Sequence, residues 1–85
     1  MASYEEIYEP IEVITFFENG KLHPLRFKWN GRVYKITRVN GCWSVQEGLN
    51  RQYHFSVNAD GPDCFELVFD TGDFNWQLAR VCLEG

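Results

Sequence analysis

The fold follows most directly from residues 24–36, which read PLRFKWNGRVYKI. Apolar and basic residues alternate on both sides of Asn30-Gly31. Such alternation is typical of half-buried strands, and Asn-Gly best accommodates the two positive φ angles of a type I′ turn. The segment therefore predicts a two-stranded hairpin with a two-residue turn.

This turn also sets the cross-strand register of the hairpin. A two-residue loop places Arg26 directly opposite Lys35, and residues opposite each other share one face of the sheet. One face then carries apolar and aromatic residues that we expect in the core: Leu25, Phe27, Tyr34 and Ile36. The other face carries three basic side chains around Val33: Arg26, Lys28 and Lys35.

The basic face contains an electrostatic conflict. Arg26 and Lys35 place like charges opposite each other, which is mildly destabilising unless an anion lies nearby. That anion is either a carboxylate of a neighbouring strand, such as Glu12 or Glu66, or the phosphate backbone of a nucleic acid. The sequence leaves both alternatives open.

The remaining apolar segments are short and are separated by turn residues. Residues 11–17 are apolar on both faces, and alternation returns in residues 53–57, 64–69 and 74–78. A second Asn-Gly at positions 40 and 41 predicts a sharp bend or another hairpin. We therefore expect an all-β fold, with about six strands in an antiparallel meander that forms a small SH3-like or OB-like barrel or a half-open sheet.

The N-terminal residues follow a different pattern. Ser3 with Glu6 fits a helix capping box, which Pro10 would stop within two turns. This predicts an acidic tail or a short helical turn over residues 1–9 and a single small all-β domain over residues 10–85.

Composition bounds the class of protein. A chain of 85 residues with 45% hydrophobic content amounts to one folded domain rather than a disordered segment. Its net charge of −4 argues against a protein that coats nucleic acid with its whole surface. The charge is uneven, however, because residues 21–51 hold seven basic residues and one acidic residue between two acidic flanks. Either neighbouring strands neutralise this basic third, or it forms a face for an anionic partner.

Catalytic and metal-binding motifs do not appear in the sequence. Cys42, Cys64 and Cys82 are scattered without a C-x-x-C pair, which predicts buried, reduced thiols, and the histidines stand at no zinc-ligand spacing. Acidic pairs such as Asp70 and Asp73 flank turn glycines, where Asp is favoured for local reasons. We therefore expect no cofactor, no metal and no enzymatic activity.

The sequence also bears on membrane insertion and secretion. No segment reaches the roughly 18 to 20 apolar residues of a membrane helix, and the acidic N-terminus does not resemble a signal peptide. We expect a cytoplasmic protein without a membrane partner.

Two tryptophans lie near the basic residues. Trp29 precedes the hairpin turn and Trp43 follows the second Asn-Gly. Each either closes one end of a thin core or stacks on the bases of single-stranded nucleic acid, as exposed rings of small barrels do. The candidate nucleic-acid site therefore comprises Arg26, Lys28, Trp29, Arg32, Lys35, Arg38 and Trp43.

The order of these motifs resembles that of a family of small bacterial domains of unknown function. The corresponding pieces are Pro10-Ile11-Glu12-Val13, residues 24–36, Trp43, Tyr53, Phe65-Glu66-Leu67 and residues 76–81. Some members of that family are encoded beside error-prone and Y-family polymerase components, so the resemblance implies work related to DNA by association only. It implies no catalytic residues.

The sequence thus predicts a binding or accessory module without catalysis. The first hypothesis is that it binds single-stranded nucleic acid through the basic hairpin. The alternative is a protein-interaction module that pairs through an edge strand with a partner or with a second copy of itself, as a homodimer. The acidic flanks favour the alternative, because they would repel a phosphate chain beyond the basic segment.

Overall fold

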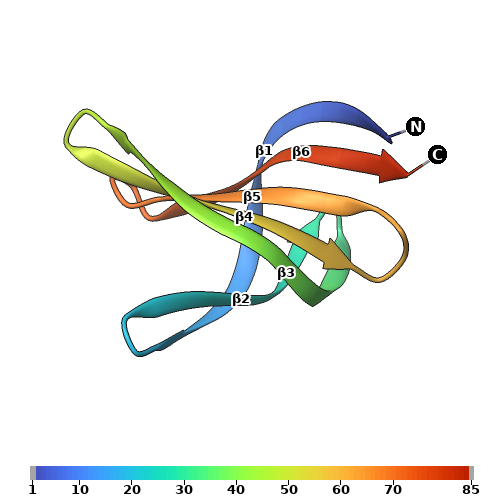
Figure 1. The fold of residues 1–85 in the computed structure, drawn as a ribbon, viewed down its shortest axis with the longest axis horizontal. Helices are drawn as coiled ribbons and strands as arrows, with labels where there is room; N and C mark the ends of the chain where they lie inside the picture. Colours follow the sequence, from blue (N-terminus) through green and yellow to red (C-terminus); the bar gives the residue numbers. More distant parts are fainter. Residues whose placement is uncertain (1, 85) are drawn as a thin grey trace.

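A computed structural model describes residues 2–84 as a closed antiparallel barrel of six strands. The strands are β1 (Ala2–Glu18), β2 (Lys21–Trp29), β3 (Arg32–Glu47), β4 (Asn50–Ala59), β5 (Cys64–Asp70) and β6 (Asn75–Glu84). Each strand pairs with the next one in the chain, and β6 returns to pair with β1 (Figure 1). The predicted all-β meander and small barrel are confirmed.

Two long strands, β1 and β3, connect the two sides of the barrel. Residues 2–11 of β1 pair with β6, and residues 12–18 pair with β2. Likewise, residues 32–35 of β3 pair with β2, whereas its remaining length pairs with β4. Bulges bend both strands, and one of them lies between Val39 and Gly41. The second Asn-Gly therefore bends β3, while the chain reverses at Gly48-Leu49.

The prediction of an acidic tail or helical turn over residues 1–9 is wrong for the described part of that segment. β1 begins at Ala2 and pairs with β6. The capping-box pattern is a local signal, and it is outweighed because the exposed edge of β6 needs a partner to close the barrel. Ile7 packs against the core from this part of β1, and a bulge between Glu6 and Glu9 accompanies a positive φ at Tyr8.

The predicted hairpin has the expected turn and register. Arg26 lies opposite Lys35 and Phe27 opposite Tyr34, and both Asn30 and Gly31 have positive φ. Phe27 is buried with residues from β4, β5 and β6 in one core. The assignment of Leu25 to the core is wrong, because its side chain is 43% exposed.

Leu25 is exposed because of a bulge between β1 and β2. Ile14 pairs with Arg26, but the next residue of β1 pairs with Pro24, so Leu25 has no cross-strand partner in this ladder. The β2–β3 ladder also ends at Arg26 and Lys35, and Ile36 pairs with Ala59 of β4 instead. Strict alternation in the sequence predicts that β2 and β3 stay paired, and it does not reveal that the two strands diverge beyond Arg26 and Lys35.

We expect Gly31→Ala to lower the free energy of unfolding by about 1 to 2 kcal/mol, because Gly31 has a φ of +77°. Apart from Gly31 and its two chain neighbours, no heavy atom of the described residues lies within 4 Å of the added Cβ, so the cost is conformational rather than steric. Urea denaturation measures the change. Gly41→Ala is the control, since Gly41 lies in β3 without a positive φ and also has open space around it. Equal losses in both variants would contradict this account of the turn.

Candidate functional site

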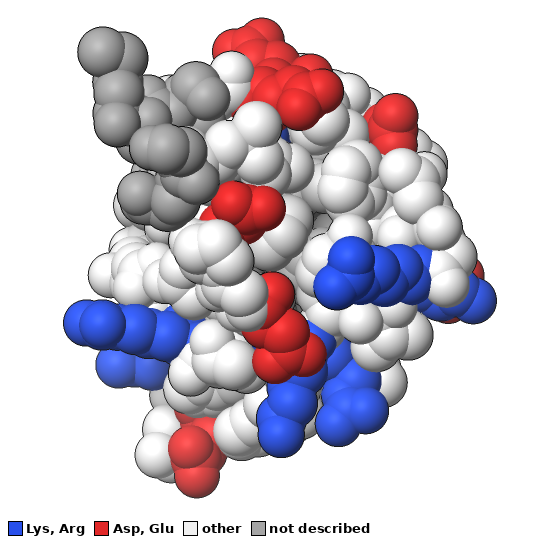
Figure 2. Space-filling model, turned by 90° about the vertical axis from the view of Figure 1, so that its right-hand side faces the viewer, with Lys and Arg blue, Asp and Glu red and all other residues white. Residues whose placement is uncertain are grey.

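The outer face of the β2–β3 hairpin carries three exposed cations: Arg26, Lys28 and Lys35. Arg26 and Lys35 occupy directly opposite positions, as the sequence predicted. Among the described residues, no carboxylate forms an ion pair with any of these three side chains, with 4.0 Å as the limit for the N···O distance. Figure 2 shows most Lys and Arg side chains of one face gathered in its lower half, with acidic groups between them.

Neither carboxylate suggested by the sequence neutralises this pair. Glu66 lies on β5, where its Oε2 is 3.3 Å from His54 Nδ1 and its Oε1 is 3.5 Å from Arg80 Nε. Its charge raises the pKa of Arg80. Glu12 lies opposite Lys28 in the β1–β2 ladder rather than opposite Arg26. The sequence offered two partners for Arg26 and Lys35, a carboxylate of a neighbouring strand or a phosphate. No ion pair of the described residues supports the carboxylate.

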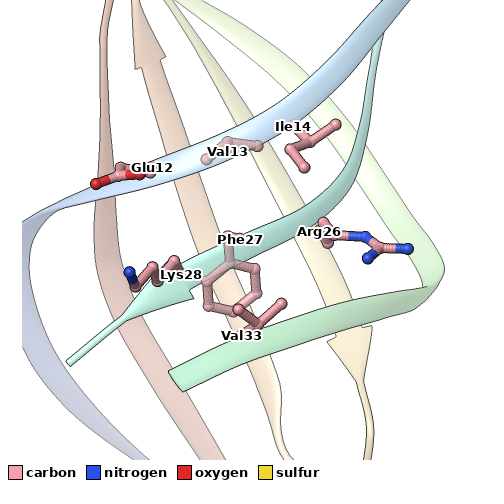
Figure 3. A pocket seen from close by; sticks show the side chains of 7 residues that line it. All are labelled: Glu12, Val13, Ile14, Arg26, Phe27, Lys28 and Val33. Carbon is pink, nitrogen blue, oxygen red and sulfur yellow. The ribbon is translucent and has the colours of Figure 1, made fainter. Parts of the chain in front are cut away.

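A hollow of about 330 Å³ lies between Arg26 and Lys28, and Lys35 is not among the residues that line it. Arg26 and Lys28 extend from β2 toward its opposite ends, and Ile14 of β1 and Val33 of β3 lie on either side (Figure 3). Ile14 and Val33 are 57% and 56% exposed, so the space between the charges has an apolar surface. Glu12 joins Lys28 at one end of the hollow.

The other predicted site residues are not gathered at this hollow. Trp29 is half-buried against the core, and its indole Nε1 donates a hydrogen bond of 2.8 Å to Glu9 Oε1. The guanidinium carbon of Arg32 lies 4.9 Å from the centre of the Tyr34 ring. Arg38 is exposed at the bulged part of β3. Trp29 therefore closes the core, as one of its two interpretations proposed.

Trp43 lies on a different part of the barrel. It stacks on His54 of β4, with ring centroids 5.3 Å apart and an interplanar angle of 11°. It lies eight positions after Lys35 in β3, beyond both bulges of that strand, and it does not line the hollow. Trp43 is 43% exposed and available to a ligand, but not as part of one compact site with the hairpin cations.

The structure also contains a larger cavity that the sequence did not indicate. At the end of the barrel where the β1–β2, β3–β4 and β5–β6 turns lie, at the left of Figure 1, there is an apolar space of about 760 Å³. Its lining includes Phe17, Leu22, Tyr53, Phe55, Phe69 and Phe74. We call this space the mouth. Its residues come from five strands and their turns, so no single sequence segment reveals it.

The mouth also contains Cys42, which is exposed rather than buried as predicted. Partial burial of the thiol raises its pKa, and the charge of Lys21 opposes this effect without reversing it. A thiol with a raised pKa remains protonated near neutral pH and is a weak nucleophile. Cys42 therefore adds apolar surface to the mouth rather than a reactive group.

Within the described chain, no three His, Cys, Asp or Glu side chains come together as a metal-ligating group. The part of the chain that the structure describes also has no helix of the length and apolar character needed to cross a membrane. Comparisons of the chain with family models, curated proteins and solved structures find no match. The candidate functions therefore rest on the hairpin face and the mouth alone.

Proposed function

We propose that the protein is a non-catalytic module that binds single-stranded nucleic acid across the outer face of the β2–β3 hairpin. The observation that supports this function best is the directly opposed Arg26 and Lys35, with no carboxylate of the described chain in an ion pair with either. Two uncompensated cations side by side are destabilising in the free protein and favourable once a phosphate lies between them.

The hollow supports the proposal that single strands are preferred over duplexes. Its apolar surface at Ile14 and Val33 can contact the flat face of a base, while Arg26 and Lys28 reach phosphates at its two ends. A paired base is covered by its neighbours in the duplex and cannot enter such a hollow. An unstacked base can, and guanidinium planes such as that of Arg26 stack on such bases in other single-strand sites.

The same geometry predicts weak binding. Three phosphate contacts from three cations give a slope of log K against log salt of about −2, since each contact to a single strand contributes about −0.7. The acidic flanks of the chain oppose longer contact with a phosphate backbone. We therefore expect a dissociation constant in the range of about 1 to 100 μM, typical of binding without sequence preference.

The test is a fluorescence-anisotropy titration with a labelled 12-nucleotide oligothymidylate. Affinity should fall about 20-fold between about 50 and 200 mM salt, and a duplex of equal length should bind more weakly. The proposal fails if the oligonucleotide does not bind at the lower salt concentration, or if its affinity is independent of salt.

A further inference from the structure

The barrel is closed by only four residue pairs between β2 and β3. Their ladder runs from Trp29 and Arg32 to Arg26 and Lys35 and then stops. Beyond it, residues 21–24 of β2 pair only with β1, Leu25 lies in the bulge, and β3 from Ile36 onward pairs only with β4. Two strand edges thus face each other across the mouth, and residues of both edges line it.

One part of the β3 edge lacks the features that normally prevent pairing. The bulges of β3 lie between Ile36 and Gly41, whereas residues 41–47 keep a regular register with β4. On the opposite edge, Pro24 has no backbone N–H and cannot donate to an added strand. Bulges and proline are the usual protection of an exposed edge. Residues 41–47 are therefore the segment of this edge that is open to another strand.

Two exposed aromatic residues also line the mouth. Phe17 and Phe74 are 73% and 76% exposed, although both line the cavity. Phe74 also has a φ of +58°, a conformation that is unfavourable for an aromatic residue. Its ring remains next to Phe69, with centroids 5.7 Å apart. Backbone strain of this kind persists only where the surrounding structure holds the residue in place, and strained residues cluster at binding and active sites.

The formal charge of the mouth is positive. Among the described residues that line it, Lys21 is the only lysine, arginine or acidic residue. It lies close enough to Cys42 for its charge to act on the thiol. An occupant of this space therefore needs apolar groups for most of its contact and gains from one negative charge near Lys21.

We propose that the mouth binds an extended segment of a partner protein, which adds as a strand to residues 41–47 of β3. Alternate side chains of the segment are apolar and enter the mouth, and an acidic residue faces Lys21. A strand is the occupant that satisfies both features of the site, because it pairs with the open backbone edge and, where that edge reaches the cavity at Cys42, places its inward side chains in the mouth. A small apolar molecule would fill the cavity and leave that edge unpaired.

This site is separate from the nucleic-acid site on the hairpin and does not depend on it. The experiment begins with selection of nine-residue peptides from a random phage-displayed library on the immobilised full chain. We expect enriched peptides to have apolar residues at alternate positions and an acidic residue at one end. Methylation of the backbone nitrogens along one edge of a synthesised peptide should abolish its binding, because that edge supplies the pairing with β3.

Phe74→Asn tests the position of the site without harming the fold. Asn tolerates a positive φ, so the melting temperature should not fall, while the affinity for an enriched peptide should drop at least about tenfold. Leu49→Asn is the matched control, since Leu49 is fully exposed at the β3–β4 turn and does not line the mouth. This variant should bind as the wild type does. Lys21→Glu should weaken peptides with the acidic residue about fivefold.

Four results would overturn the proposal. They are the absence of any enriched peptide, enrichment without the alternating pattern, equal affinity of an enriched peptide for Phe74→Asn and wild type, and a stable dimer that Phe74→Asn dissociates. The last result, seen by sedimentation velocity, would assign the mouth to a second copy of this chain.

Discussion

Phe27→Ala is expected to lower the free energy of unfolding by about 3 to 5 kcal/mol. Phe27 is fully buried, and its ring stacks on Tyr34 at 4.9 Å and meets the edge of Phe65 at 5.2 Å. It also lies opposite Val13 of β1 in the β1–β2 ladder, so its loss leaves a cavity where three strands meet. A chain of this length has a total stability of about 4 to 13 kcal/mol. The variant should be partly unfolded at 37 °C.

Urea denaturation at 25 °C measures this effect, with Val33→Thr as the control. Val33 belongs to the same hairpin but points outward and is largely exposed, so Val33→Thr should change stability by less than about 0.5 kcal/mol. A loss below about 1 kcal/mol for Phe27→Ala would show that the hairpin does not contribute the centre of the core.

Reversing both opposed charges should have the largest effect on nucleic-acid binding. In the double variant Arg26→Glu/Lys35→Glu, the affinity for oligothymidylate should fall at least about 100-fold at low salt, and the slope of log K against log salt should become shallower by about 1.4. Two phosphate contacts are lost and two repulsive charges replace them. The variant should fold as the wild type does, because both side chains are exposed.

A matched control separates this local effect from the change in net charge. Lys21→Glu/Arg51→Glu alters the net charge equally, but Lys21 lies at the mouth and Arg51 at the start of β4. We expect this control to lose no more than about threefold in affinity. Equal losses in the two double variants would mean that the hairpin is not the binding face.

The strands and the hairpin could be predicted because they depend on local patterns. Asn30-Gly31 specifies the turn, and period-two alternation specifies which side of β2 and β3 faces the core. The same rules failed where pairing depends on distant strands. Leu25 is exposed because β1 and β2 form a bulge there, and the N-terminal residues form a strand because β6 needs a neighbour.

The candidate site could be predicted in part for the same reason. The opposed Arg26 and Lys35 follow from the register of one turn, so they are where the sequence placed them. Trp29 and Trp43 depend on how the whole barrel curves, and only the structure separates them from the hairpin cations. The mouth arises where β2 and β3 diverge. The sequence predicted that the two strands stay paired as far as Leu25 and Ile36, and such pairing leaves no space for this cavity.

The most direct test of the proposed function is an NMR titration of the isotope-labelled protein with oligothymidylate. The account predicts that the backbone amides with the largest changes in chemical shift are those of Arg26, Lys28, Val33 and Lys35. The chemical shifts of residues 41–47 and of Phe74 should not change. Changes concentrated at the mouth, or no changes at saturating oligonucleotide, would contradict it.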